Sequence, residues 1–409
     1  NDNSKQIIKK YEDIENVFTV YQSNNGLNKS NNIALKMARG KYLIRLDADD
    51  YLDPHALELM VSKLDEHKDI ALVFPDYYEV DIDGNILKQI QRHNFDKDVT
   101  LFDQPAHGAC TMIRKNVLMQ VGGYDESEKK QDGYDIWIKI IDKYKISNIN
   151  LPLFFYRQHQ NNLTRDEKDL LEVRSRIKEK HVSKKGKKLS VLAIVPIRGN
   201  NYDPRSFPLK KFNNKCLLDY TLDEAISNNY LTDILVTTPE KDVINYVNKK
   251  YKKIFLLKRD PKLAKINTPL NETILDAVNF YASKKNKTDA IMILNIENPF
   301  RSEIYIKKAI HTMQLYDVDT VVGVSDDDGL FLKHTGSGME LVNPSSSLRL
   351  ERDKLYRKVG GLTLIKTNAF RKSNQLITGE VGHIFLDNRA ALCLDSDFNV
   401  EIFNSLLAN

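Results

Sequence analysis

The chain has 409 residues, which is too long for one ordinary hydrophobic core, so we expect two domains of roughly 150 to 200 residues each. Hydrophobic residues make up 41% and charged residues 29%, a composition that excludes gross disorder. The net charge of +5 is small against 61 basic and 56 acidic residues, and no aromatic-interleaved basic stripe accompanies it. Nucleic acid is therefore not an expected partner.

The three cysteines, Cys110, Cys216 and Cys393, lie far apart, are odd in number and have no metal-ligand spacing. They favour a reducing compartment, so we expect the protein in the cytoplasm. No run approaches the roughly 20 apolar residues of a membrane span, and we do not expect this chain to cross a membrane. The sequence opens on Asn1 with a polar stretch typical of a domain interior, and we expect that an N-terminal piece is missing.

The first elements alternate between strand and helix. They are a β-rich run at 16–21, a helix over 29–39 ended by Gly40, and a buried strand over 42–46. That strand runs directly into Asp47-Ala48-Asp49-Asp50, and a helix begins after Asp53-Pro54, where Asp can cap and Pro suits the first turn. Ligands bind at the carboxyl ends of strands in open α/β sheets, so the acidic cluster lies where a site is expected.

The alternation continues along the first half of the chain. The further elements are a strand over 70–74, a turn at Asp83-Gly84, a helix over 115–121 ended by Gly122-Gly123, and a helix over 134–143. Alternating strands and helices predict an α/β layer fold.

A charge-rich segment at 166–188, helical over 166–180 and then basic, is the expected linker. A second α/β pattern follows over 189–409, with strands at 191–195, 234–237 and 254–257 and helices at 219–228 and 243–249. The two halves share no spaced motif, which indicates a fusion rather than a repeat.

Asp47 and Asp49 are the first candidates for chemistry. Carboxylates at i and i+2 leaving a strand can share one pocket, where hard oxygen ligands suit Mg²⁺ or Mn²⁺. Taken alone, an Asp-x-Asp pattern is also typical of a solvated acidic loop or a helix cap.

Five motifs follow one another in this half of the chain: Asn24 to Asn32, Ala38-Arg39-Gly40-Lys41-Tyr42, Leu46 to Asp50, Gly122-Gly123-Tyr124-Asp125-Glu126 and Gln131-Asp132-Gly133-Tyr134-Asp135-Ile136-Trp137. Together they resemble the family-two glycosyltransferases of GT-A fold. The resemblance implies inverting transfer from a nucleotide sugar, with Asp132 as the general base. It also implies that Asp47, Asp49 and Asp50 bind the donor and its metal, while Asp135 and Trp137 shape the acceptor side.

Two positions qualify this resemblance. Gln131 stands where the family commonly has Glu, so Asp132 loses one acidic neighbour. His159 matches a place where the family often has a His near the diphosphate, so it is either a metal ligand or a surface histidine.

The family also begins with strands that hold the nucleobase, and only residues 1–4 could be their tail. We therefore expect residues 1–165 to be a transferase domain without its N-terminal strands. A chain that begins at Asn1 should bind donor poorly.

The second half contains a further series of motifs: Pro196 to Asn201, Lys215 to Thr221, Ile234 to Thr238, Arg259 to Ala264, Leu294 to Arg301, Tyr356 to Gly361 and Leu394 to Phe398. This series resembles the sialic acid and Kdo cytidylyltransferases over about 189–407. The resemblance implies activation of an acidic sugar by CTP. It assigns CTP binding to Arg198, Gly199, Lys210, Lys215 and Arg301, and a metal to Glu297, Asp395 and Asp397.

Departures from the second family leave two readings open. The family's Ala-Arg-Gly-Gly-Ser-Lys loop appears as residues 197–202 without its lysine, for which Lys210 or Lys211 could substitute, and Cys393 replaces the first Asp of the terminal pair. The domain is either an active cytidylyltransferase or a scaffold that positions or dimerises the transferase. Asp326-Asp327-Asp328-Gly329 is more typical of a solvated turn than of a metal loop.

Taken together, the sequence predicts two Rossmann-like nucleotide-binding domains of α/β class, the first of GT-A fold and the second nucleotidyltransferase-like. We expect a bifunctional enzyme of surface-polysaccharide synthesis that uses Mg²⁺ or Mn²⁺. Its expected partners are a nucleotide-sugar donor, a glycan acceptor, CTP, an acidic sugar, a membrane-associated glycan assembly complex and a second copy bound through the C-terminal domain. The motifs do not encode which sugars are used.

Overall fold

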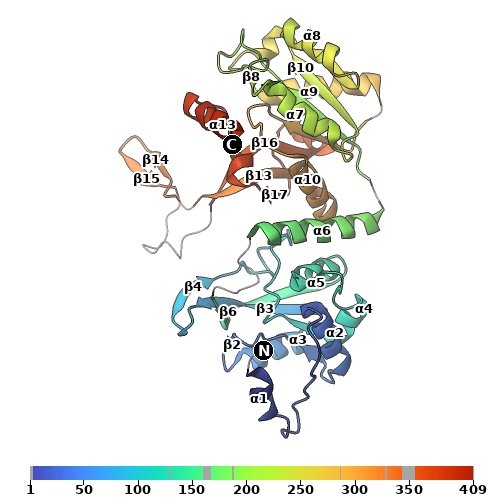
Figure 1. The fold of residues 1–409 in the computed structure, drawn as a ribbon, viewed down its shortest axis with the longest axis vertical. Helices are drawn as coiled ribbons and strands as arrows, with labels where there is room; N and C mark the ends of the chain where they lie inside the picture. Colours follow the sequence, from blue (N-terminus) through green and yellow to red (C-terminus); the bar gives the residue numbers. More distant parts are fainter. Residues whose placement is uncertain are drawn as a thin grey trace. The chain divides into compact units, whose positions relative to one another are not determined.

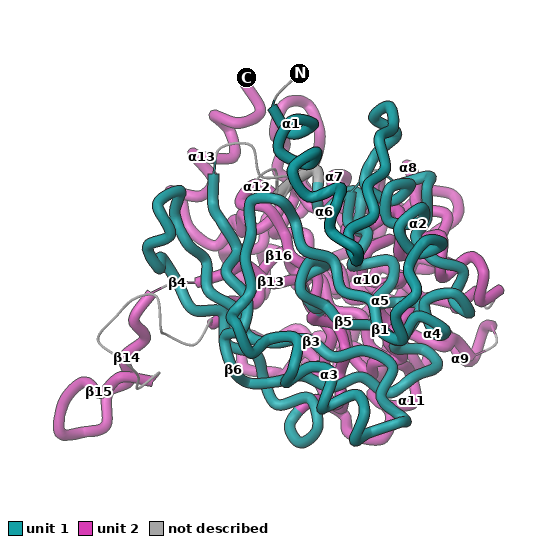
Figure 2. Tube along the Cα trace, turned by 90° about the horizontal axis from the view of Figure 1, so that it is seen from below, with its two compact units in different colours: residues 1–98, 105–174 teal, residues 99–104, 175–409 magenta. Residues whose placement is uncertain are grey.

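The computed structural model describes residues 3–128, 130–159, 167–186, 188–285, 287–327, 329–342 and 355–408. The chain divides into two compact units, the first of residues 1–98 and 105–174 and the second of residues 99–104 and 175–409 (Figure 2). Helix α6 (Glu167–Lys185) carries the chain from the first unit into the second. The predicted domain boundaries and linker stay a prediction.

The first unit is a six-stranded sheet with helices packed on it (Figure 1). Its strands are β1 (Tyr42–Leu43), β2 (Tyr51–Leu52), β3 (Ile70–Val80), β4 (Ile86–Ile90), β5 (Met112–Arg114) and β6 (Lys145–Arg157). Its helices are α1 (Ser4–Lys9), α2 (Leu27–Met37), α3 (Ala56–Glu66), α4 (Lys115–Gln120), α5 (Asp132–Ile141) and the start of α6. The strand order is β1-β5-β3-β6-β2, with β4 paired to β3.

Strands β3 and β6 form the parallel centre of this sheet. The first five residues of β3 are all buried, because both faces of the sheet are covered there. Ala56, Met60 and Leu64 of α3 are fully buried against the sheet, since residues four apart share one face of a helix. The expected helices are confirmed within a few residues, and the strand expected at 70–74 is confirmed but continues to Val80.

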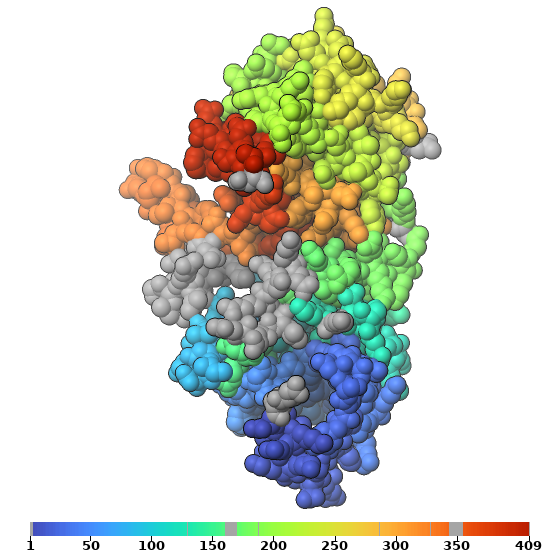
Figure 3. All heavy atoms as spheres, viewed as in Figure 1, coloured from blue at the N-terminus to red at the C-terminus, as the bar shows by residue number. Residues whose placement is uncertain are grey.

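Two expected strands of the first unit are corrected by the structure. Residues 16–21 form no strand, and Phe18 is 57% exposed. Of the buried strand expected over 42–46, only Tyr42 and Leu43 are paired, and Leu46 is exposed. A β-rich sequence becomes a strand only beside a partner, and within the described residues β1 has a neighbour on one side only. Figure 3 shows the dark-blue N-terminal segment on the surface of the unit.

The second unit contains a seven-stranded sheet and two short hairpins. Its strands are β7 (Val191–Pro196), β8 (Lys211–Phe212), β9 (Lys215–Cys216), β10 (Asp233–Thr238), β11 (Ile254–Lys258), β12 (Ala290–Leu294), β13 (Thr320–Asp327), β14 (Leu332–His334), β15 (Met339–Leu341), β16 (Leu355–Lys366) and β17 (Val381–Phe385). Its helices are α7 (Leu217–Ser227), α8 (Lys241–Lys250), the 3₁₀ turn η1 (Pro261–Ala264), α9 (Leu270–Lys284), α10 (Glu303–Tyr316), α11 (Thr367–Ser373), α12 (Asn388–Ala391) and α13 (Asp397–Ala408).

Strand β7 is an inner strand of the order β11-β10-β7-β12-β16-β13-β17, between β10 and β12 and parallel to both. Successive side chains of a strand point to opposite faces, so Val191, Ala193 and Val195 enter one core and Leu192 and Ile194 the other. The expected strands and helices of this half are confirmed, and both units have the expected α/β class.

The strand order reverses direction at β7. The chain runs outward from β7 through β10 to β11, then returns to place β12 on the opposite side of β7. Loops that leave the carboxyl ends of strands on the two sides of such a switch point enclose a crevice.

Helix α6 extends further than the sequence predicted, because Lys184 and Lys185 form its last turn instead of following it. Cations suit this end of a helix, where free carbonyl groups carry partial negative charge. Among the described residues, no helix combines the length and the apolar character needed to span a bilayer.

Candidate functional site

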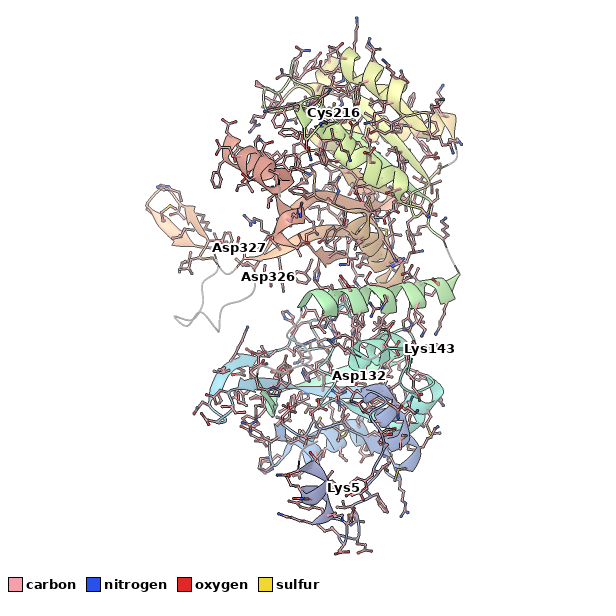
Figure 4. All side chains as sticks on the ribbon, in the orientation of Figure 1. Lys5, Asp132, Lys143, Cys216, Asp326 and Asp327 are labelled. Atoms are coloured by element: carbon pink, nitrogen blue, oxygen red, sulfur yellow. The ribbon has the colours of Figure 1, made fainter. Side chains whose placement is uncertain are left out.

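A cavity of about 320 Å³ in the first unit brings together predicted acids of two segments and the predicted histidine of a third. Asp47 and Asp49 follow β1, Asp132 is the first residue of α5, and His159 follows β6. The remaining lining side chains include Leu27, His107, Tyr134, Tyr156, Leu170 and Arg174. Figure 4 labels Asp132 at the start of its helix.

Arg45 lies between the two groups of acids. Its guanidinium forms an ion pair with Asp132, and its Nε lies 3.0 Å from Oδ1 of Asp47. The sequence analysis missed Arg45, although it stands two residues before Asp47, a spacing that places both side chains on the same face of an extended chain. Partial burial raises the pKa of the Asp47 carboxyl, and Arg45 opposes that shift.

Asp49 is paired with the predicted histidine. Oδ2 of Asp49 lies 2.7 Å from Nε2 of His159. Arg157 fixes this region, because its Nε donates to the carbonyl of Asp49 over 2.8 Å and its backbone N–H donates to Oδ1 of Asp50 over 2.9 Å. Asp50 is buried beside the cavity rather than lining it, and burial raises its pKa to about 6.

The start of α5 is held by a close approach of two backbones. A Cβ atom on Gly133 would lie 2.7 Å from the Cα of Gly108, so only glycine fits at this contact. Asn31 adds a hydrogen bond of 3.3 Å from its Nδ2 to Oδ2 of Asp132. The carboxylate of Asp132 therefore faces the cavity from a fixed backbone.

Asp135 and Trp137, predicted for the acceptor side, do not line this cavity. Trp137 is 1% exposed and makes edge contacts with Phe74 and Phe95 in the core. Asp135 is buried, with its carboxylate 2.6 Å from the amine of Lys139 one turn along the helix. Their placement suits support of α5 better than contact with a substrate.

His107 is a further lining residue that the sequence analysis missed. Its ring packs beside Tyr156, with ring centroids 4.5 Å apart, and near Phe154. Burial, with the charge of Arg45, lowers the pKa of His107 to about 4, so the imidazole is neutral at pH 7. No sequence motif marks this histidine.

A second cavity of about 290 Å³ lies at the switch point of the second unit. Three residues predicted from the sequence meet there: Arg198 after β7, Glu297 after β12, and Asp395 before α13. The side chains that sequence reasoning missed are Asp203, Arg205, Arg259, Thr268 and Thr273. Burial raises the pKa of the Glu297 carboxyl.

Arg259 is the most buried cation of this cavity, with 1% of its surface exposed. Its Nη2 donates to the carbonyl of Thr237 over 2.8 Å, and its Nε lies 3.4 Å from Oγ1 of the same residue. Burial lowers the pKa of Arg259 to about 10, which leaves it charged at pH 7. Its signal in the sequence is its place directly after strand β11.

The loop after β7 is closed by Glu240. Oε1 of Glu240 accepts the backbone N–H of Asn201 over 3.0 Å, and Oε2 accepts the side-chain amide of Asn201 over 2.7 Å. Gly199 has a φ of +87°, and a Cβ there would meet Glu240 at 1.9 Å. The expected phosphate loop therefore has one of its amides bound to a carboxylate.

Five residues predicted for the second site do not line the cavity: Gly199, described above, and Lys210, Lys215, Arg301 and Asp397. The amine of Lys210 lies over the rings of Phe207 and Phe212, and Lys215 pairs with Asp223 over 2.8 Å. Arg301 donates to the backbone carbonyls of residues 295, 360 and 361 from a fully buried position. Asp397 is exposed at the start of α13.

Asp326 and Asp327 end strand β13, and Asp328 lies outside the described residues (Figure 4). The backbone N–H of Gly329 donates to Oδ1 of Asp327 over 3.0 Å, a contact typical of a turn. Among the described residues, no three His, Cys, Asp or Glu side chains group closely enough to hold a metal alone.

A larger cavity of about 610 Å³ lies elsewhere in the second unit, beside α6 and α10. Glu179 accepts from Tyr230 and pairs with Lys307 at its edge. None of the residues predicted for catalysis lines it.

Residues 1–122 match the family model of glycosyl transferase family 2. An uncharacterized glycosyltransferase of Methanocaldococcus jannaschii is 33% identical over 179 residues, which are 42% of this chain and 62% of that protein. The chondroitin synthase of Pasteurella multocida is 26% identical over 163 residues, 39% of this chain and 17% of that protein. The chain thus spans less than two thirds of the length of each.

Solved structures of two cytidylyl enzymes are also similar. A 4-diphosphocytidyl-2C-methyl-D-erythritol synthase from Anaerococcus prevotii has 12% identity and a TM-score of 0.42, over 54% of this chain and 97% of that one. A CMP:2-keto-3-deoxy-manno-octonic acid synthetase complexed with CTP has 10% identity and a TM-score of 0.40, over 54% of this chain and 98% of that one. These values are too low to assign chemistry to the second unit, which depends on its own side chains.

Proposed function

The chain carries a glycosyltransferase family 2 domain at its N-terminal end, and we propose that its first unit transfers a sugar from a nucleotide-sugar donor to a glycan hydroxyl. The observation that supports this most is the convergence of Asp47, Asp49 and Asp132 on one cavity from segments far apart in the sequence. Asp47 and Asp49 would bind the donor, and Asp132 would act on the acceptor hydroxyl.

In the proposed reaction, Asp132 takes the proton of the acceptor hydroxyl. The hydroxyl oxygen bonds to the anomeric carbon from the face opposite the nucleotide, which inverts that carbon. The bond from the anomeric carbon to the diphosphate oxygen breaks, and the nucleotide leaves with both electrons. Asn31, Arg45 and the Gly108–Gly133 contact hold Asp132 for this step.

Asp49 and His159 fit a divalent cation as a pair of protein ligands. Mg²⁺ is commonly held by one or two carboxylates together with substrate phosphates, so two protein ligands suffice when the donor supplies oxygens. The 2.7 Å contact between Asp49 and His159 keeps both groups at one point. A bound Mg²⁺ or Mn²⁺ would neutralise the departing diphosphate.

Calorimetric titration with a panel of UDP- and GDP-sugars tests donor binding. We expect donor binding that Mn²⁺ strengthens, and Asp49→Asn should remove the effect of Mn²⁺. The absence of any Mn²⁺-dependent binding across the panel would contradict the proposed transfer.

For the second unit we propose CTP-dependent activation of an acidic sugar. The hydroxyl oxygen of the sugar would bond to the α-phosphorus, the bond to the β-phosphate would break, and diphosphate would leave while the hydroxyl proton passes to water. The meeting of Arg198, Glu297 and Asp395 around an open cavity supports this activity over a scaffold whose pocket is filled. Arg205 and Arg259 supply cations where the expected lysine is missing.

Diphosphate release from CTP, Mg²⁺ and a panel of acidic sugars tests this activity. Release that Glu297→Gln abolishes supports it. No release across a broad panel, together with a dimer in light scattering that depends on the second unit, would favour the alternative of a scaffold or dimerisation module.

Together the two activities would make a bifunctional enzyme of surface-polysaccharide synthesis, in which one unit activates a sugar and the other transfers one. The names of the relatives, chondroitin synthase and hyaluronan synthase, support a glycan product. A glycan assembly complex at a membrane is the proposed partner.

A further inference from the structure

Gln131 directly precedes the proposed base and has an unusual backbone. Its φ is +60° and its ψ is +35°, which places it in the left-handed region at the N-cap of α5. Residues other than glycine adopt this conformation rarely, and it persists where neighbouring groups hold it. The conformation of Gln131 sets the direction in which α5 begins, and so the place of Asp132.

Arg174 of helix α6 holds this residue. Its Nε donates to Oε1 of Gln131 over 2.7 Å, and its guanidinium carbon lies 5.1 Å from the ring centre of Tyr134. The side chain of Arg174 therefore contacts residues on both sides of Asp132. Arg174 and Leu170 also line the acid cavity, so one turn of α6 forms part of its wall.

The partner of Arg174 is the side-chain amide of Gln131. A planar guanidinium can bind either an amide oxygen or a carboxylate, but its bond to a carboxylate is charge-assisted and stronger. Substitutions at Arg174 or at residue 131 can therefore weaken or strengthen this pair while Asp132 itself is unchanged.

We infer that Arg174 is a positioning residue of the proposed transfer, because it fixes Gln131 and thereby aims Asp132 into the acid cavity. The inference rests on the proposed function of that cavity. Arg174 acts through Gln131 and Tyr134, not by contact with the reacting atoms.

Hydrogen–deuterium exchange of the full chain tests the positioning without any substrate. Arg174→Ala should raise deuterium uptake in the peptide that covers 131–141. Glu172→Ala is the matched control, because Glu172 is exposed two residues away on α6 and should leave this uptake unchanged. Equal uptake in wild type and Arg174→Ala would overturn the inference whether or not the protein is active.

Kinetics test the catalytic consequence. With a panel of UDP-sugars and Mn²⁺, we expect Arg174→Ala to lower kcat of nucleotide release about 10- to 100-fold, with KM changed less than twofold, because small displacements of a reacting group carry such costs. Arg174→Lys should lower kcat less, and adding Gln131→Glu to Arg174→Lys should restore it by forming an ion pair. A rise in KM with kcat unchanged would overturn the inference, because it would make Arg174 a donor contact.

The two failures are distinguishable. No nucleotide release by wild type, with uptake changed as expected, counts against the proposed transfer and leaves the positioning contact supported. Release by wild type with normal kcat in Arg174→Ala counts against the positioning role alone. Thermal unfolding of each variant separates these outcomes from misfolding.

Discussion

The two cavities take their charged side chains from different kinds of element. In the first unit, Asp47 and Asp49 lie in the loop after β1, Asp132 begins α5, and Arg45 pairs with acids of both groups. In the second, Arg198 follows β7, Glu297 follows β12 and Asp395 precedes α13. The first cavity therefore depends on where one helix begins, and the second on the ends of neighbouring strands.

The two cavities are alike in their balance of charge. In the first, the three acids Asp47, Asp49 and Asp132 face the three cations Arg45, Lys130 and Arg174, and Arg45 pairs with acids of both groups. In the second, Arg198, Arg205 and Arg259 face a similar number of acids. Mixed charge of this kind suits a ligand that carries phosphates on one side and a cation on the other.

The largest expected effect is in the first cavity. Asp132→Asn should lower kcat of transfer about 10²- to 10⁴-fold, the usual contribution of a general base, with little change in donor binding. Calorimetry for donor affinity and nucleotide release for kcat measure the two separately. A fall in kcat of less than tenfold would show that Asp132 is not the general base.

The next largest effect is on stability, and it distinguishes the structural Arg301 from the ligand-binding Arg198 in the second unit. Arg301→Met should lower the free energy of unfolding of this unit by about 3 kcal/mol or more, because it leaves buried carbonyls unpaired. Arg198→Met should cost about 1 kcal/mol or less in stability and should weaken CTP binding instead. Chemical denaturation and CTP titration of both variants make the measurement. An Arg301→Met protein of normal stability would contradict the structural role.

Two histidines whose pKa is lowered give a matched pH effect, one in each unit. Burial lowers the pKa of His107 and of His311 to about 4, against a usual value of 6.5. The unfolded chain binds more protons between these values, so stability should fall as the pH falls from 6.5 to 4 and be fully present above 6.5. The loss should be at most about 3 kcal/mol for each histidine.

Calorimetric scans at pH 7 and pH 5 check this pair. His107→Phe should reduce the acid sensitivity of the first unit only, and His311→Phe that of the second only. A variant that keeps the full acid sensitivity of its unit would show that its histidine is not the source.

The smallest expected effect is on Lys210. Because its amine lies over two phenylalanine rings, Lys210→Ala should change CTP affinity less than twofold, whereas Arg259→Lys should weaken it clearly. Parallel CTP titrations compare them. A tenfold loss of CTP affinity in Lys210→Ala would show that Lys210 binds CTP, as the sequence predicted, and would contradict the role given to Arg259.

The spacing of apolar residues and the residues that begin and end helices predicted most of the helices and strands, because both signals are local in the sequence. The strand expected at 16–21 failed for a non-local reason, since a β-rich run needs a neighbour that the sequence does not name. Trp137 was placed near the acceptor by its motif, but its size and apolar surface suit the core in which it lies. Burial of a motif residue cannot be deduced from the motif.

The residues that sequence reasoning missed act through tertiary contacts. Arg45 could have been found from its spacing to Asp47, and Arg259 from its place after a strand. His107 carries no such signal, because its neighbours Phe154 and Tyr156 come from a distant strand. Motif spacing thus located Asp47, Asp49 and Asp132, whereas the place of His107 depends on contacts that only the fold provides.

Helix α6 has a practical consequence for producing the transferase half alone. A fragment cut at residue 165, where motif boundaries would place its end, would lose Leu170 and Arg174 and with them one wall of the acid cavity. Extending the fragment through Lys185 keeps the whole helix and ends on its own basic turn. A comparison of soluble yield for the two lengths would show how much of the transferase half depends on residues that the family motifs do not include.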